Sequence, residues 1–271
     1  MKAFSAIGIV VCIGGLFLGA TMEGSNVMAV LSPSAMSIVL VGTFGAAAAG
    51  GGFSATKAIP KLIIKAFTSE PPDMNGRLSE LVGFAEKARR DGLLALDEQV
   101  SSIDDPFTRK GMQMVVDGTD PDVVAEVLEL ENDNMKKRHK AFSQPFEKAG
   151  GYAPTMGIIG TVFGLIHVLQ NLASPQTLGP MISAAFVATL IGIASANVFY
   201  LPMATRLKGL SEEEHHFRSM TIEGILAIQA GENPRTIAEK LITFVPPDQR
   251  PADGDAAAAA KGAAEPARAA A

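Results

Sequence analysis

Two long stretches of the chain contain almost no charged residues. No Asp, Glu, Lys or Arg occurs from Ala149 to Thr205, and Glu23 is the only charged residue from Ala3 to Thr56. A soluble domain could not expose such stretches, because water-facing loops and helix faces need polar side chains. The lack of charge therefore excludes an ordinary soluble protein. It predicts a membrane protein in which charged regions lie between and after two apolar hairpins.

The chain also lacks cysteine pairs and any recognisable catalytic constellation. Its single cysteine, Cys12, cannot form an internal disulfide. No glycine-rich phosphate loop or Cys/His ligand cluster is present, and the neighbouring His215 and His216 are a weak metal signal. The net charge of -5 argues against a nucleic-acid partner. We expect no enzymatic activity, no bound metal and no cofactor.

Each apolar stretch is long enough for two membrane helices, since about 20 residues cross the hydrocarbon layer. Polar residues and prolines interrupt the first stretch between Thr21 and Ser34 and the second between Asn171 and Pro180. A cleaved signal peptide is the alternative for the first span, but no good A-x-A site follows it. The predicted spans lie near residues 3–20, 34–53, 152–172 and 181–203, in hairpins 1–56 and 149–205.

Lysines and arginines flank the predicted spans and are absent from both hairpin connections. The positive-inside rule therefore places both connections outside, and the N-terminus, the middle segment and the C-terminus in the cytoplasm. The sequence predicts an all-α integral membrane protein with four transmembrane helices and a helical cytoplasmic domain, residues 57–148, between the second and third. The flanking basic residues are Lys57, Lys61, Lys65, Lys136, Lys137, Arg138, Lys140, Lys148, Arg206 and Lys208.

The charged regions have helical periodicity and no strand alternation. Lysines recur every four residues from Lys57 to Lys65, which predicts a helix in the lipid interface with its apolar side toward lipid. Residues 206–246 are predicted to form cytoplasmic C-terminal helices, and 247–271 a disordered Ala-rich tail. A further helix is expected over about 93–103. Helix boundary signals stand at Gly92, Asp105-Pro106, Asp120-Pro121 and Asn233-Pro234.

Small residues line one face of the third and fourth predicted spans, as in membrane helices that pack closely. Thr161 and Thr189 lie on this face, near the middle of the membrane when counted from the span ends. A lone threonine in a membrane helix usually bonds to its own backbone. Two of them on a close helix pair favour a hydrophilic path for an ion or for water. The small residues are Gly157, Gly160, Gly164, Ala185, Ala188, Gly192, Ser195 and Ala196.

Three further residues in these spans are candidates for function. Pro154 and Pro202 stand at the predicted cytoplasmic ends, as boundary residues or as hinge points. His167 lies near the wet outer end of its span, so a packing role is favoured over an ion relay. No span contains the Asp or Glu that an ion-conducting protein normally presents. Either the chain conducts nothing or a partner chain supplies the carboxylate.

Several separated motifs resemble the A subunit of the bacterial flagellar stator, the MotA/PomA family. The resemblance extends from Met1 to Pro246. Its motifs are RRDGLLALD at 89–97, DG at 117–118, YAPTMG at 152–157, GTVFG at 160–164 and SAAFVATLIG at 183–192.

The resemblance implies a multi-pass protein of the bacterial inner membrane, a homopentamer around a dimer of B subunits. In that family the B subunit carries the ion-binding aspartate and a peptidoglycan anchor, and the A ring turns to push on the C-ring protein of the rotor. Carried over by position, the rotor contacts are Arg89, Arg90, Asp97 and Glu98, the hinge residues are Pro154 and Pro202, and the ion-path residues are Thr161 and Thr189.

The resemblance leaves the transported ion open between H+ and Na+. A threonine at 161 resembles the sodium-driven members, but related proton-driven complexes also have threonine there. An ExbB/TolQ-like energy transducer is the first alternative, although those proteins have their large cytoplasmic segment after the first span. A structural membrane scaffold without ion flux is the second alternative, which a flux measurement would decide.

Overall fold

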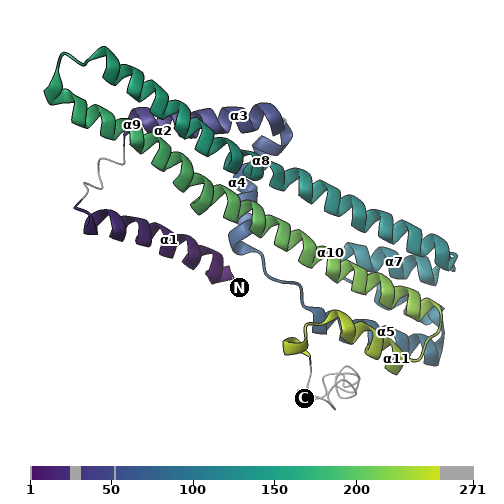
Figure 1. The fold of residues 1–271 in the computed structure, drawn as a ribbon. Coiled ribbons are helices and arrows are strands. Elements are labelled where there is room, and N and C mark those ends of the chain that lie inside the picture. The colour runs from purple at the N-terminus through teal and green to yellow at the C-terminus, as the bar shows by residue number, and fades with distance from the viewer. Residues whose placement is uncertain (1, 25–31, 52, 251–271) are drawn as a thin grey trace, which may run out of the picture. The chain divides into compact units, whose positions relative to one another are not determined.

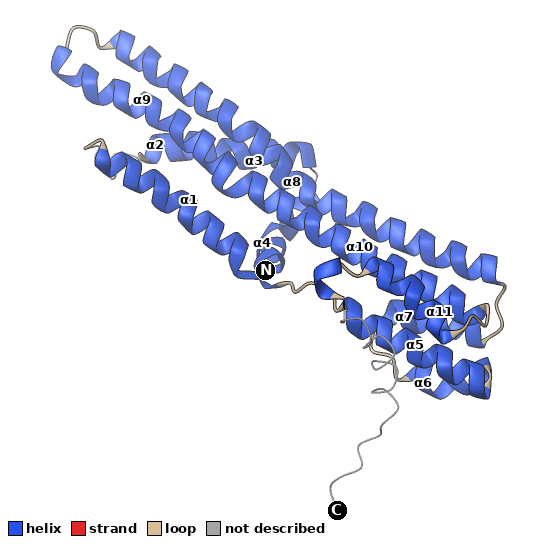
Figure 2. Cartoon of the chain, turned by 60° about the horizontal axis from the view of Figure 1, so that its bottom comes forward, coloured by secondary structure: helices blue, strands red, loops and turns tan. Residues whose placement is uncertain are grey.

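The computed structural model describes residues 2–24, 32–51 and 53–250, and the regular elements in these ranges are helices (Figure 2). The chain divides into two compact units. We call residues 1–70 with 138–211 the apolar unit, and residues 71–137 with 212–271 the charged unit. This division differs from the sequence prediction, which treated 57–148 and 206–246 as separate regions.

The apolar unit is built from helices that carry the uncharged stretches of the sequence. In chain order they are α1 (Lys2–Met22), α2 (Pro33–Met36), the π-helix η2 (Ser37–Val41), α3 (Gly42–Gly51), α4 (Phe53–Thr68), the second part of α8 (Pro121–Gln170), α9 (Pro175–Ser195), the π-helix η4 (Ala196–Tyr200) and the first part of α10 (Leu201–Gln229). Within this unit α8 and α9 run side by side and are joined by a short turn (Figure 1).

Three of these helices contain a segment that is long and apolar enough to cross a membrane, namely Pro33–Gly50, part of Pro121–Gln170 and part of Pro175–Gln229. They correspond to the second, third and fourth predicted spans. The first predicted span forms α1, whose apolar part, Ala6–Met22, is a shorter helix. The total of four crossings therefore stays a prediction. The predicted break at 171–180 is shorter in the structure, because α9 already begins at Pro175.

The helix α4 packs its apolar side on protein. Ala66 is buried in a cluster with Phe146 of α8 and Met203 of α10, and Phe67 packs against the same cluster. The sequence pattern predicted lipid as the partner of this apolar side, because an apolar helix face has the same pattern whether it packs on protein or on lipid. Three lysines of α4 are exposed, namely Lys57, Lys61 and Lys65. Their exposure fits a position at the lipid interface, which stays a prediction.

The charged unit contains α5 (Met74–Asp91), the 3-10 helix η3 (Leu93–Leu96), α6 (Asp97–Ser101), α7 (Pro106–Val116), the first part of α8, the second part of α10, α11 (Pro234–Leu241) and the 3-10 turns η5 (Ile242–Phe244) and η6 (Pro247–Gln249). The helix starts predicted at Pro106, Pro121 and Pro234 are confirmed. The helix predicted over 93–103 is instead split into η3 and α6.

Polar caps account for these boundaries. The carboxylate of Asp105 accepts hydrogen bonds from the backbone N–H groups of Phe107 and Thr108, and Asn233 caps α11 by accepting from Arg235. The helix α5 ends where Gly92 adopts φ 86, a conformation that favours glycine. Residues 247–249 of the predicted tail form the turn η6. Residues 251–271 lie outside the described residues.

One hydrophobic core holds the charged unit together, and the C-terminal helices complete it. Leu81 and Leu96 are fully buried in the same cluster as Met220 and Ile225 of α10 and Leu241 of α11. The middle segment alone therefore lacks part of its core. This explains why residues 212 onward belong to the same unit as 71–137.

Candidate functional site

The structure brings Thr161 of α8 and Thr189 of α9 into direct contact. Their hydroxyl oxygens are hydrogen-bonded to each other. The Thr161 hydroxyl also lies 3.1 Å from the carbonyl oxygen of Gly157 and 3.1 Å from that of Ala185, and the Thr189 hydroxyl lies 3.4 Å from the Gly157 oxygen. The two residues that the sequence analysis placed on one small-residue face thus form one polar site between two apolar helices.

This close approach depends on glycine. A Cβ atom at Gly157 would lie 2.9 Å from the carbonyl oxygen of Ala188 and 3.1 Å from the Cα of Thr189. A Cβ at Gly192 would lie 2.5 Å from the carbonyl oxygen of Ala153. Both obstacles are backbone atoms, which cannot rotate away. The glycines therefore set the distance between the helices at which the two threonines meet.

The site gathers four oxygen atoms, two from hydroxyls and two from carbonyls. Each hydroxyl has one proton to donate, so the pair cannot satisfy all of these acceptors at once. At least one acceptor keeps a free lone pair. Oxygen ligands of this kind replace water around a hard cation, and a hydroxyl pair can also pass a hydrogen bond from one side to the other. The arrangement suits cation or proton handling, but it contains no group that titrates.

Pro154 and Pro202 both lie inside helices. Each lacks the N–H that would bond the carbonyl four residues earlier, which belongs to Gly150 for Pro154 and to Val198 for Pro202. Val198 is part of η4, where the Leu201 N–H bonds to the Ala196 carbonyl five residues before it. The helix just before Pro202 therefore has the wider π-helical geometry. Such π-helical turns are often found at functional sites and at kinks in helices.

His167 is exposed near the end of α8 and contacts Asn171, whose amide nitrogen lies 3.4 Å from the ring Nδ1. The same amide donates to the His167 carbonyl oxygen at 2.8 Å. Neither Thr161 nor Thr189 contacts this ring among the hydrogen bonds of the described residues. The contact suits the hydrogen-bonded role that the sequence analysis favoured.

The four predicted rotor-contact residues are exposed on the charged unit, on both sides of the turn at Gly92. Arg89 and Arg90 lie in the last turn of α5, whereas Asp97 and Glu98 begin α6. Arg90 pairs with Asp91 at 3.0 Å. This hydrogen bond, together with their charges, raises the pKa of Arg90 and lowers the pKa of Asp91. Asp97 accepts a hydrogen bond from Gln113 at 3.2 Å.

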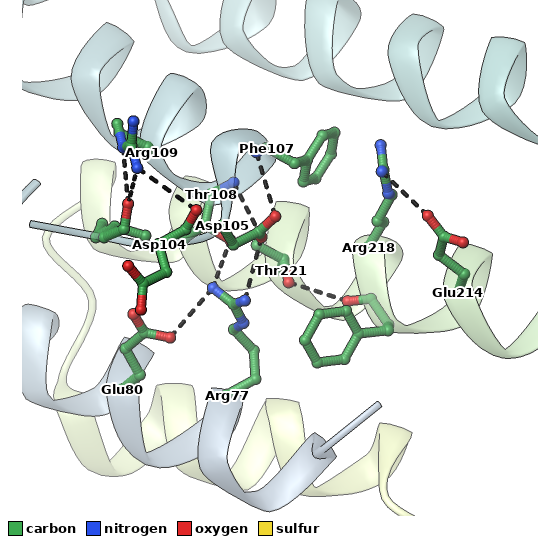
Figure 3. A network of polar contacts seen from close by, with 12 residues as sticks. Arg77, Glu80, Asp104, Asp105, Phe107, Thr108, Arg109, Glu214, Arg218 and Thr221 are labelled. Carbon is green, nitrogen blue, oxygen red and sulfur yellow. Dashed lines mark hydrogen bonds and ion pairs between the residues drawn. The ribbon is translucent and has the colours of Figure 1, made fainter. Parts of the chain in front are cut away.

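A partly buried ionic cluster around Arg77, near the start of α5, was not predicted from the sequence (Figure 3). The guanidinium of Arg77 donates to Thr108 and to Asp105 at 3.1 Å, pairs with Glu80 at 3.1 Å and lies over the ring of Phe217. Arg77 is buried although it stands on a helix with an exposed charged face. Its place among the apolar positions Leu78, Leu81 and Val82 was the only sequence signal.

The groups around Asp105 lower the pKa of its carboxyl. Burial of the carboxyl acts to raise it, but the hydrogen bond from the Thr108 hydroxyl, the charge of Arg77 and the two backbone N–H donors outweigh that effect. Asp105 is therefore both the cap of α7 and the counter-charge of Arg77. The cluster ties α5 to α7 and, through Phe217, to α10.

Known proteins resemble this chain over nearly its whole length. Residues 99–220 match the model of the MotA/TolQ/ExbB proton channel family. A relative from Borreliella burgdorferi, named Motility protein A, is 36% identical over 250 residues, which are 92% of this chain and 96% of that protein. The chain belongs to the Motility protein A (MotA) family.

Other members support the same assignment. Motility protein A of Bacillus subtilis is 35% identical over 251 residues, covering 92% of this chain and 93% of its own. A solved structure of C. jejuni MotAB has a TM-score of 0.88 and 31% identity, covering 92% of this chain and 98% of that one. The flagellar MotAB stator complex from B. subtilis has a TM-score of 0.83 and 35% identity, covering 90% and 96%. The resemblance to the MotA family and the all-helical membrane fold are confirmed.

Proposed function

We propose that this chain is the A subunit of a flagellar motor stator, which forms an ion channel with a B subunit and converts an ion gradient into torque. The Thr161–Thr189 pair carries the proposal. It is a polar site between two apolar helices, in a chain whose predicted spans contain no Asp or Glu. Relatives named Motility protein A, and structural neighbours that are MotAB assemblies, support this function.

Because the predicted spans contain no Asp or Glu, the B subunit must supply the carboxylate of the ion path in this proposal. An ion needs a reversible negative charge along its path, and we assign that charge to an aspartate of the partner. The hydroxyls of Thr161 and Thr189 and the carbonyls of Gly157 and Ala185 face the passing ion beside it. Large apolar side chains on the outer faces of α8 and α9, such as Phe163 and Phe186, are exposed in the single chain. They need lipid or neighbouring subunits, which supports a place in the membrane; a homopentamer in the inner membrane is what the family resemblance implies.

In this proposal the charged unit transmits torque to the rotor. With the N- and C-termini in the cytoplasm, Arg89, Arg90, Asp97 and Glu98 face the C-ring protein of the rotor. Charged contacts of this kind steer an encounter and release quickly, as a stepping contact requires. Pro154 and Pro202 act as hinge points that couple ion passage at the threonine pair to movement.

The ion is H+ or Na+. The family description as a proton channel favours H+, whereas the oxygen-lined site would also suit Na+. The matched family model also includes TolQ and ExbB, but the relatives from B. burgdorferi and B. subtilis that match 92% of the chain are named Motility protein A, which favours the stator function.

Swimming speed against external sodium concentration tests the ion-path assignment, in cells whose only A subunit is this chain or a variant. Thr161→Ala keeps nearly the same volume and removes one oxygen. If the motor uses sodium, we expect the variant to be slow at low sodium and partly rescued at high sodium, because replacing the hydration shell needs several oxygens. If the motor is indifferent to sodium, we expect little change.

Thr155→Ala is the matched control. Thr155 lies on the same helix, is exposed, and bonds only to the Tyr152 carbonyl at 2.8 Å among its described contacts. Cells with the Thr155→Ala variant should swim at the same speed as the parent at every sodium concentration. A sodium-dependent motor that Thr161→Ala leaves unchanged would remove Thr161 from the ion path.

A further inference from the structure

The apolar unit contains a cavity that is separate from the threonine pair. It has a volume of about 280 Å³ and lies between α1, α4 and the junction of η4 with α10. An engineered apolar cavity of roughly 150 Å³ holds one benzene molecule. Its walls include Gly8 and Cys12 of α1, Phe67 of α4, and Met203 and Arg206 of α10. Such a cavity has room for part of a hydrocarbon chain.

The lining is mostly apolar. Arg206 is the only charged residue among the residues that line the cavity, and Asn197 adds an amide. On α4, which supplies Phe67, Lys61 and Lys65 are exposed. A cation beside an apolar cavity, with further cations on the adjoining helix, complements an amphipathic molecule that carries a negative charge at one end.

We propose that this cavity binds one anionic phospholipid. An acyl chain of the lipid lies between α1 and α10, and its phosphate lies at Arg206. The cavity lies along two predicted spans, α1 and the end of α9 with η4, so lipid reaches it from the bilayer. A free phosphate ion would gain nothing from the apolar walls. Pro202 lines the same cavity. The bound lipid therefore contacts the helix segment where η4 meets α10 and joins it to α1.

Fluorescence quenching tests the headgroup preference. The chain has no tryptophan, so Phe67→Trp places its single tryptophan in the cavity wall, and the parent complex gives the background from the B subunit. In vesicles, brominated phosphatidylglycerol should quench this tryptophan with roughly fivefold higher affinity than brominated phosphatidylcholine, the effect of one basic residue near a lipid surface.

Two charge variants in the Phe67→Trp background assign the preference to one residue. Arg206→Gln should bring the affinity ratio close to one, because Lys61 and Lys65 do not line the cavity. Lys208→Gln removes a nearby charge that pairs with Glu147 at 3.0 Å and does not line the cavity, so it should keep the preference. Equal affinities in the parent background, or a preference that survives Arg206→Gln, would overturn the headgroup assignment. Absence of quenching by either lipid would show that no acyl chain enters.

A second measurement does not depend on the tryptophan variant. Gly8 lines the cavity and an added Cβ there meets no heavy atom within 4 Å, so Gly8→Leu is chosen to place a bulky side chain at the cavity wall. Gly15→Leu on the same helix has equally free space but does not line the cavity. Native mass spectrometry of the purified complex should find retained phosphatidylglycerol in the parent and Gly15→Leu and its loss in Gly8→Leu. Equal retention in all three would contradict the proposal. Neither assay requires ion flux, so their failure is distinct from failure of the stator function.

Discussion

The close contact between α8 and α9 makes Gly192→Ala the most informative single substitution. The added Cβ would lie 2.5 Å from the Ala153 carbonyl oxygen and 3.1 Å from the Gly157 Cα. A carbon and a carbonyl oxygen in contact stand about 3.3 Å apart, so the helices must separate by roughly 0.8 Å. Because both obstacles are backbone, no side-chain rotation relieves the clash. Overpacking of this kind costs about 1–3 kcal/mol.

The same separation should disturb the threonine pair, since Thr189 stands one turn before Gly192 on the same face. Adding about 0.8 Å to the 3.1 Å contact between the Thr161 hydroxyl and the Ala185 carbonyl oxygen takes it past about 3.5 Å, where a hydrogen bond is lost. We therefore expect Gly192→Ala to lower the thermal midpoint of the purified A–B complex and also to change ion flux in vesicles. Gly179→Ala on α9 is the control, because a Cβ there meets nothing within 4 Å. If the two variants match in stability and in flux, close packing of α8 on α9 does not shape the site.

Two further predictions concern the charged unit. Reversing the charges of Arg89 and Arg90 to Glu should weaken or abolish swimming while assembly and ion flux stay intact; normal swimming of the double variant would remove them from the rotor contact. Arg77→Met should destabilise the complex by about 1–2 kcal/mol, because it removes a charged hydrogen bond from Asp105, which is partly exposed and keeps its backbone donors; an unchanged thermal midpoint would contradict this. The pKa of Asp105 is below its usual value of 3.8, so its stabilisation is present above that pH and is lost as pH falls through the lowered pKa. Thermal midpoints measured below about pH 4 should therefore fall more steeply for the parent than for Arg77→Met.

Local signals in the sequence were sufficient for much of the helical framework. An acidic or amide cap followed by proline predicted the starts at Pro106, Pro121 and Pro234, because both the cap bond and the fixed φ of proline act within one turn. The meeting of Thr161 and Thr189 was also predictable, since small residues at helical spacing leave one face on which two membrane helices can approach.

Contacts between distant segments were not predictable from one sequence. The burial of Met220 and Leu241 with Leu81 depends on the chain returning after two hairpin helices, and periodicity does not reveal which amphipathic faces meet. The Arg77 cluster has the same origin, because its partner Asp105 already had a local role as a helix cap. The apolar side of α4 shows a further limit, since its pattern is the same for a protein partner and for lipid.

The division of the ion path between two chains is the central claim, and flux into sealed vesicles measures it directly. The chain should be reconstituted alone, with its B subunit, and with a B subunit whose membrane aspartate is replaced by asparagine. We expect selective H+ or Na+ flux only for the intact pair, because the predicted spans of this chain contain no carboxylate. Selective, sustained flux through the chain alone would contradict it.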